Sequence, residues 1–313
     1  MNPTIVIAGE VNVDLIFAGV PMLPQFGHET LAQTYVQRPG SSSMILAMGL
    51  ARLGDNVRFA GRCGEDAFGR YCIDALRERG VDTQAIIADA ASGTGVTVAI
   101  SSQRDRALLT WLGAIAELTA TDIDDTLFAG AHHLHVSAYY LQAGLRPGLG
   151  ALFARARAAG LTTSLDPGAD PEQRWGHELF DVLPQVDVFL PNEDEARALS
   201  GCDEPEAALR AFANGHTRTA IKLGARGAIM LDEGAPVFAP GFRVDAVDTT
   251  GAGDSFNSGF LHAWLRDVAP LECLRWGNAC GALSTRGLGG TATQASAEEA
   301  SALLASQLSP APA

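Results

Sequence analysis

The sequence predicts an α/β protein with a doubly wound, mainly parallel β-sheet, helices on both faces and a small β lid. Two observations support this prediction. Short apolar, strand-like segments alternate with helix-length segments over most of the chain, which is typical of parallel βαβ units. Polar residues follow several of the strand-like segments, at the edge where sheets of this class bind ligands.

The N-terminal part contains the first strands and helices and two segments that interrupt the pattern. A strand is expected over 4–17, a helix over 41–54 with serines at its start, a strand over 56–64 and a helix over 67–80. Residues 94–113 alternate in the manner of a β-hairpin. Because segments 15–39 and 94–112 do not fit the strand–helix alternation, we expect them to form the small lid over the ligand-binding edge.

The remainder of the chain repeats the strand–helix alternation. Strands are expected over 132–137, 162–167, 187–192, 219–224 and 227–232, and helices over 146–159, 193–200, 204–214 and 253–266. Polar groups then gather at one edge of the sheet, at Asp14, Asp166, Asn192, Gly224 and the turn 248–254. No internal repeat or linker divides the chain, so residues 1–313 are expected to form a single domain.

Composition and charge exclude several classes of function. The chain has 313 residues, 47% of them hydrophobic, and a formal net charge of −14, which opposes binding to nucleic acid or an anionic membrane surface. No apolar run is long enough to span a bilayer, and the N-terminus lacks a signal-like basic segment, so we expect a soluble cytoplasmic protein. The five cysteines are scattered, which favours free thiols over disulfides or a zinc site.

The lysine content excludes common nucleotide-binding motifs. Lys222 is the single lysine of the chain and has no glycine-rich loop before it, so a Walker A motif is absent. The Gly-rich loop and H-R-D motif of protein kinases are missing as well. Without G-x-G-x-x-G, a nicotinamide-dependent dehydrogenase is also disfavoured.

Residues 244–260, "VDAVDTTGAGDSFNSGF", combine a strand-like run, a glycine turn and the start of an amphipathic helix. Backbone amides at a helix N-terminus lack intrahelical partners, so those of Gly251, Ala252 and Gly253 could hold phosphate oxygens as an anion hole. Asp254, in the first turn, could be a general base. The alternative is that Asp254 only caps its helix. The positive helix end is expected to keep Asp254 ionised.

Five motifs, in order, resemble those of the ribokinase-like (PfkB) carbohydrate kinase family, between residues 4 and about 295. They are "GEVNVD", "GSSSMILAMGLARLG" with "AGRCGEDAFG", "LPNEDEARAL", "IKLGARG" and, as the most specific, "DTTGAGDSF". The resemblance implies a ribokinase-like fold and an enzyme that transfers the γ-phosphoryl group of ATP to a hydroxyl of a sugar or sugar acid. It also implies that Asp254 is the base of this reaction.

The same resemblance implies a set of substrate-binding residues, with Asp14 hydrogen-bonding substrate hydroxyls: Asn12, Asp14, Gly40, Ser41 and Ser42. Carboxylate and amide groups suit sugar hydroxyls, which both donate and accept hydrogen bonds. Two positions depart from the ribokinase pattern. Ile45 stands where the family usually has Asn, and Ser41 replaces the second glycine of a pair. The substrate pocket is therefore not that of ribokinase, and the particular sugar is left open.

Nucleotide and metal sites also follow from the resemblance. Asn192 and Glu195 would organise Mg²⁺ through water, while Lys222, Gly224 and Gly227 would face the nucleotide and Asn278 the adenine. The alternative for "NEDEARAL" is a solvated helix start with Asn192 as its N-cap. A monovalent cation such as K⁺ would bind near the residues Asp248, Thr250, Ser284, Gly287 and Gly289.

Two alternative functions remain open. The chain could be a nucleoside kinase of the same family, although no aromatic base slot is evident, or a non-catalytic regulator that binds sugar or nucleotide. The exposed edges of the lid strands favour a homodimer in which two lids pair. The alternating histidines His132, His133 and His135 could suggest zinc, but the lack of matching ligands favours structural roles.

Overall fold

A computed structural model describes residues 2–102 and 106–306, and it contains two sheets. In these ranges the larger sheet has nine strands in the order β13-β12-β11-β10-β9-β8-β1-β4-β5. They are β1 (Thr4–Ala8), β4 (Asn56–Gly64), β5 (Asp82–Asp89), β8 (His133–Val136), β9 (Thr162–Leu165), β10 (Val188–Phe189), β11 (Arg218–Lys222), β12 (Gly227–Asp232) and β13 (Ala235–Pro240). Only the β11–β12 and β12–β13 pairs are antiparallel, so the predicted mainly parallel sheet is confirmed.

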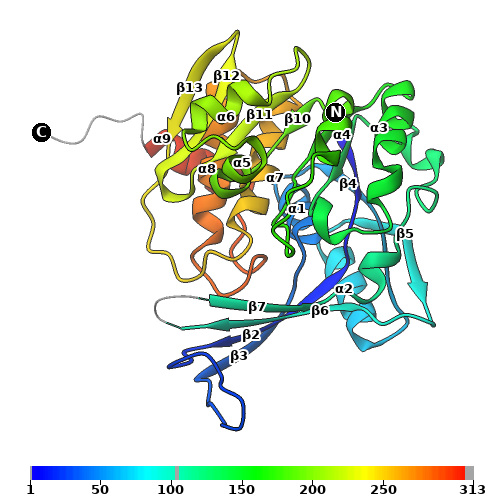
Figure 1. The fold of residues 1–313 in the computed structure, drawn as a ribbon, viewed down its shortest axis with the longest axis vertical. Helices are drawn as coiled ribbons and strands as arrows, with labels where there is room; N and C mark the ends of the chain where they lie inside the picture. The colour runs from blue at the N-terminus through cyan, green and yellow to red at the C-terminus, as the bar shows by residue number, and fades with distance from the viewer. Residues whose placement is uncertain (1, 103–105, 307–313) are drawn as a thin grey trace, which may run out of the picture.

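Helices cover both faces of the larger sheet (Figure 1). They are α1 (Ser42–Arg52), α2 (Ala67–Glu78), α3 (Leu149–Ala158), α4 (Glu178–Val182), α5 (Glu193–Ser200), α6 (Pro205–Ala211), α7 (Ala252–Trp264), α8 (Pro270–Ser284) and α9 (Ala297–Ser306). Alternate residues of β1 enter different cores: Ile5 and Ile7 pack with α1, α2, α7 and α8, and Val6 and Ala8 with α3 to α6. This alternation is the physical basis of the two helical layers.

Short 3₁₀ segments complete the connections: η1 (Gly113–Glu117), η2 (Asp125–Phe128), η3 (Tyr139–Leu141), η4 (Arg146–Gly148), η5 (Leu183–Gln185) and η6 (Gly224–Arg226). Most predicted elements are found within a few residues of their expected bounds, and α5 coincides with its predicted range. Strands β5 and β13 and helices α4, α8 and α9 were not predicted. Their apolar patterns are short or interrupted, so tertiary packing defines them more than local sequence does.

The second sheet has the order β3-β2-β6-β7 and lies below the helical layers in Figure 1. It consists of β2 (Asn12–Ala18), β3 (Thr34–Pro39), β6 (Gly95–Ser101) and β7 (Arg106–Trp111). These strands fall almost entirely within the segments predicted to form the lid, so the small β element is confirmed. The turn of the predicted hairpin, residues 103–105, lies outside the described residues.

The predicted N-terminal strand over 4–17 is wrong in one respect, because it is two strands in different sheets. β1 ends at Ala8 in the larger sheet, and β2 begins at Asn12 in the second sheet. The short link between them places Glu10 at the boundary, where its side chain is only 3% exposed. The link between Ala8 and Asn12 therefore connects the two sheets beside the polar edge.

The histidines of β8 have hydroxyl partners inside the sheet layer. His133 Nε2 and His135 Nδ1 both lie 2.6 Å from Ser164 Oγ on β9, and His135 Nε2 lies 2.7 Å from Ser137 Oγ. Burial lowers the pKa of His133 well below its ordinary value and that of His135 to about 3. Both imidazoles are therefore neutral, hydrogen-bonded core groups at neutral pH.

Candidate active site

A cavity of about 230 Å³ brings together residues from both sheets and from α1 and α7. From the predicted substrate set it includes Asn12, Asp14, Ser41 and Ser42. From the predicted catalytic turn it includes Thr250, Gly251 and Asp254. These groups lie more than 200 residues apart in sequence, so the fold assembles one site from the two ends of the chain.

The turn before α7 is compact because Gly251 occupies the left-handed region at φ 70° and caps the helix. A Cβ atom at Gly251 would lie 2.7 Å from the Gly290 Cα and 3.0 Å from the Ile45 Cδ1. A side chain is therefore excluded by conformation and by contact. Ile45, the residue that departs from the family pattern, packs against the catalytic turn and lines the cavity.

Asp254 lies in the first turn of α7, as predicted, and its surroundings oppose the ionisation that the helix end favours. Burial and the nearby Asp166 carboxylate raise the pKa of Asp254 to about 6, against the opposing effects of Lys222, a Ser42 hydrogen bond and Arg106. The positive end of the helix favours the ionised form of Asp254, but burial and the nearby carboxylate have the larger effect on its pKa. Above pH 6 the carboxylate is ionised, and its raised pKa makes it a stronger proton acceptor than an ordinary aspartate.

Asn12 and Asp14 share one face of β2, and Asn12 Nδ2 donates to Asp14 Oδ1 at 2.9 Å. Burial, then Asp254 and Asp248, raises the pKa of Asp14 to about 7. A Cβ atom at Gly40 would lie 2.1 Å from Asp14 Oδ1, so glycine is needed for the carboxyl to fit. Asn12 Oδ1 is buried without a hydrogen-bond partner among the described residues.

Ser41 has φ 62° and ψ 146°, close to a region that almost only glycine occupies. Its hydroxyl donates to the Glu10 carbonyl at 2.8 Å and accepts from the Met44 amide at 3.0 Å. These two hydrogen bonds offset the backbone strain that replacement of the usual glycine introduces. Ser41 thereby caps α1 and holds the link between the two sheets.

Lys222 is buried beneath the catalytic turn instead of extending into solvent. Its Nζ donates to Asp166 Oδ2 at 2.6 Å and to Asn257 Oδ1 at 3.3 Å. A Cβ atom at Gly253 would lie 3.6 Å from this nitrogen, so the ammonium group underlies the predicted anion hole. Burial opposes the charge of Lys222, but Asp166 and Glu195 outweigh it and raise the pKa of Lys222.

Asn192 and Glu195 form a reciprocal capping box at the start of α5. Asn192 Oδ1 accepts from the Glu195 amide at 2.9 Å, and Glu195 Oε2 accepts from the Asn192 amide at 2.8 Å. The capping alternative thus describes their hydrogen bonds, and the predicted metal role stays a prediction. Burial and Asp166 raise the pKa of Glu195 to about 7.

The carboxyl groups at this edge fit a hard divalent cation. Glu195, Asp166 and Asp254 crowd one another, and a cation would relieve the repulsion that raises the pKa of Glu195 and Asp254. Among the residues described, no three His, Cys, Asp or Glu side chains are arranged to bind a metal by themselves. Mg²⁺ would therefore depend on water and nucleotide oxygens for most of its ligands.

The remaining predicted nucleotide residues lie around β11 to β13 and α8. Gly224 begins η6 at φ 59°, and Gly227 begins β12 at φ 116°, where a Cβ atom would lie 2.0 Å from the Ala239 carbonyl oxygen. Asn278 is 7% exposed, and its Nδ2 donates to the Ala239 carbonyl at 3.0 Å. Asn278 thus fixes β13 to α8, and its contact with adenine stays a prediction.

Two loops meet at the predicted monovalent-cation site. Asp248 Oδ1 accepts from the Thr250 amide at 2.9 Å, and Asp248 Oδ2 accepts from the Gly289 amide at 2.8 Å. The Ser284 carbonyl accepts from Thr293 Oγ1 at 2.8 Å. Asp248 therefore joins the catalytic turn to the segment that contains Ser284, Gly287 and Gly289. Carboxylate and carbonyl oxygens are suitable ligands for such a cation.

Several residues of the site were not predicted. Glu10, Thr97, Arg106 and Thr110 line the cavity. Glu10 accepts from Ser43 Oγ at 2.5 Å, and burial raises its pKa to about 7. The polar end of β1 could have identified Glu10, which lies within "GEVNVD". The others lie in segment 94–112, which was predicted to form the lid, but no motif distinguished them from their neighbours in that segment.

The fold places this protein in a class of α/β proteins with a large, mainly parallel sheet and a second, smaller sheet beside a polar cavity. The model of the pfkB family carbohydrate kinases matches residues 2–297. The chain belongs to this family. It is a sugar kinase, an enzyme that transfers a phosphoryl group to an alcohol group.

Individual relatives agree with this assignment. The ATP-dependent ribose-1-phosphate kinase of Halopiger xanaduensis is 33% identical over 300 residues, covering 95% of this chain and 96% of the relative. The 2-dehydro-3-deoxygluconokinase of Bacillus subtilis is 29% identical, covering 85% and 86%. A solved ribokinase from Thermotoga maritima has a TM-score of 0.82 at 26% identity, covering 97% and 99%, which confirms the ribokinase-like fold. Across the described ranges, no helix is long and apolar enough to cross a membrane.

Proposed function

We propose that this protein transfers the γ-phosphoryl group of ATP to a hydroxyl of a sugar or sugar acid, with Asp254 as the general base. One observation carries the proposal: Asp254, at the N-terminus of α7, faces the same cavity as Asn12 and Asp14. A base and a set of hydroxyl-binding groups thus converge on one small space.

In this proposal, the amides of Gly251, Ala252 and Gly253 form the anion hole. The first amides of α7 have no intrahelical acceptor, and the helix dipole adds positive potential. Lys222 lies below this turn, and its charge is paired with the buried Asp166 carboxylate. Asp254 accepts the proton of the acceptor hydroxyl while the oxygen bonds to phosphorus. Positioning and charge stabilisation provide most of the rate enhancement in phosphoryl transfer.

The substrate is held by Asn12, Asp14, Gly40, Ser41 and Ser42. The Asp14 carboxyl accepts hydrogen bonds from substrate hydroxyls, and Asn12 and the serines border the same cavity. Ile45 replaces a polar amide with an apolar surface beside the catalytic turn. This favours a substrate whose contacts differ from those of ribose in ribokinase.

The nucleotide extends toward Asn192, Lys222, Gly224, Gly227 and Asn278. Asn192 and Glu195 would hold Mg²⁺ through water, and the ion would neutralise charge on the ATP phosphates. The loops of Asp248, Thr250, Ser284, Gly287 and Gly289 would hold K⁺. Support comes from the oxygen-rich groups at these positions and from the crowded carboxyls beside Glu195.

We also propose that residues 1–313 form one cytoplasmic kinase domain, with 15–39 and 94–112 as its lid, and that two copies dimerise through the lid. Apolar side chains of the second sheet support the dimer, since Tyr35, Leu109 and Trp111 are 54%, 71% and 58% exposed. Burying such side chains against a second copy would remove apolar area from water.

The proposal is tested by measuring ADP release from Mg-ATP across pentoses, hexoses, sugar acids, sugar phosphates and nucleosides. Wild type is compared with Asp254→Asn and with Asp203→Asn, an exposed control. We expect turnover with one class of sugar, a loss of at least about 100-fold in Asp254→Asn, and unchanged activity in the control. Removing the base while keeping the side-chain volume isolates proton transfer.

The alternatives give different results. Turnover with nucleosides alone would identify a nucleoside kinase. ATP binding without turnover of any acceptor would favour a regulator. Full activity in Asp254→Asn would contradict the role of Asp254 even if a sugar were phosphorylated.

A further inference from the structure

The transferred phosphoryl group needs positive charge beside it, but the ammonium group of Lys222 is paired with Asp166. Lys222 Nζ lies 2.6 Å from Asp166 Oδ2, and the two side chains are only 10% and 6% exposed. Its charge is therefore largely matched by a buried carboxylate. Among the described residues that line the cavity, Arg106 is the one basic side chain. The lining also contains the carboxyl groups of Glu10, Asp14 and Asp254.

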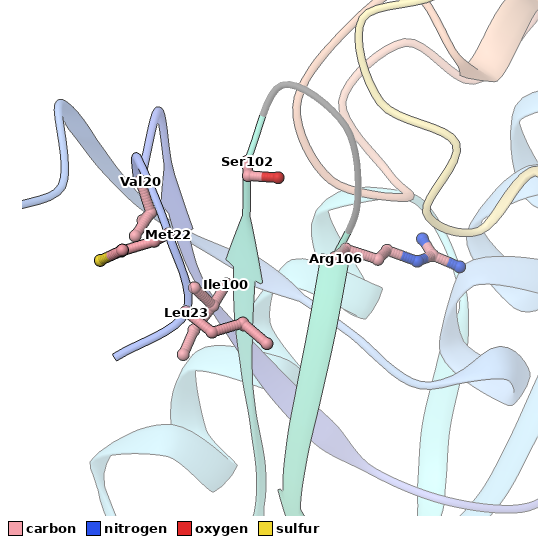
Figure 2. Close-up of a pocket in the computed structure, with 6 residues that line it drawn as sticks. All are labelled: Val20, Met22, Leu23, Ile100, Ser102 and Arg106. Carbon is pink, nitrogen blue, oxygen red and sulfur yellow. The ribbon is translucent and has the colours of Figure 1, made fainter. Parts of the chain in front are cut away.

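Arg106 extends from the second sheet to the catalytic turn. It is the first residue of β7, and its Nη1 donates to Thr250 Oγ1 at 2.8 Å. Thr250 directly precedes Gly251, the N-cap of α7. Figure 2 shows the Arg106 side chain pointing away from the apolar group of Val20, Met22, Leu23 and Ile100. The guanidinium thus lies beside the predicted anion hole, 144 residues away in sequence.

The electrostatics agree with this placement. Burial raises the pKa of both Asp14 and Asp254, and the Arg106 charge acts against the rise at each. Arg106 therefore acts on the proposed base and on the proposed substrate-binding carboxyl at once. A guanidinium also has five N–H donors in a planar arrangement that matches phosphate oxygens.

We propose that Arg106 is a catalytic residue whose guanidinium contacts the phosphoryl group during transfer. The inference rests on the proposed kinase reaction. In that step the acceptor oxygen bonds to the γ-phosphorus, and its proton moves to the Asp254 carboxylate. The bond from the γ-phosphorus to the β–γ bridging oxygen breaks, and its electron pair stays on ADP. Arg106 stabilises the negative charge on the oxygens of the transferred group, which makes the second sheet part of the catalytic machinery.

The test compares Arg106→Ala, Arg106→Lys and the control Arg174→Ala, whose arginine side chain is 78% exposed. Arg106 is itself exposed, so its variants should fold, and melting curves verify this. With the substrate that wild type uses, Arg106→Ala should lose about 100- to 1,000-fold in kcat, with the KM for the acceptor changed little. Added guanidinium chloride at millimolar concentration should restore part of the lost rate.

A second measurement separates catalysis from ground-state binding. Arg106→Ala should weaken binding of ADP with aluminium fluoride, which imitates the phosphoryl group in transfer, more than it weakens binding of ATP. An unchanged kcat in Arg106→Ala would overturn the proposal. A raised KM for anionic acceptors alone would also overturn it, because it would assign Arg106 to substrate recognition. If wild type phosphorylates no acceptor, the proposed function fails and the inference with it. If wild type is active, failure concerns Arg106 alone.

Discussion

The buried ion pair between Lys222 and Asp166 allows a quantitative prediction about stability. Replacing Lys222 by Met keeps the apolar stem but removes the charge that Asp166 faces at 2.6 Å. Breaking a buried ion pair by removing one partner typically costs about 3–5 kcal/mol. Because Asp166 also lies near the carboxyls of Glu195 and Asp254, we expect Lys222→Met to lower the free energy of unfolding by an amount in this range at pH 8.

The pH dependence of this effect has a defined sign. In wild type, burial opposes ionisation of Asp166, but Lys222, together with hydrogen bonds from Asn257 and Gly168, outweighs burial and lowers the pKa of Asp166. Its contribution to stability is present above the ordinary pKa and is lost as the pH falls. In Lys222→Met, the hydrogen bonds from Asn257 and Gly168 remain, but the Lys222 charge that favours ionisation is lost, so the pKa of Asp166 is higher than in wild type. The stability loss should therefore be largest at pH 8 and shrink toward pH 5.

Urea unfolding followed by circular dichroism measures this change. The matched control is Arg210→Met, which breaks an exposed pair with Glu206 and should cost less than about 1 kcal/mol. The double variant Lys222→Met with Asp166→Asn should recover most of the loss, since no unpaired charge remains. If Lys222→Met costs no more than Arg210→Met, or if the loss grows at low pH, our reasoning about the pair is incorrect.

Two further predictions concern the core and the lid. Burial lowers the pKa of His135 to about 3 from an ordinary 6.5, so the free energy of unfolding should be highest above pH 6.5 and should decline as the pH falls toward 3. Urea unfolding midpoints of wild type and His135→Gln, measured across this pH range, test the prediction. An equal decline in both proteins would contradict it. Light scattering after size exclusion should give twice the mass of one chain for wild type. Leu109→Lys should reduce the measured mass to that of a single chain, whereas the control Leu271→Lys on α8 should leave it unchanged. A wild-type monomer at micromolar concentration would exclude the dimer.

The sequence by itself determined the fold class and the centre of the site. The alternation of strands and helices indicated a mainly parallel sheet, and "DTTGAGDSF" indicated a helix N-terminus with Asp254 in its first turn. Both depend on interactions between neighbouring residues, such as turn geometry, helix capping and the spacing of apolar side chains. Local patterns of this kind can be read directly from a chain.

Only the tertiary structure decided how distant groups affect one another. The sequence placed Lys222 near a nucleotide, and only the fold shows that Asp166, which follows β9, and Asn257 of α7 are its hydrogen-bond partners. The pKa of Asp254 follows from burial and a nearby carboxylate, which outweigh the helix end that the sequence emphasised. Arg106 reaches the catalytic turn because the fold brings the start of β7 beside Thr250. Burial and charge pairing depend on long-range packing, which local sequence patterns do not encode.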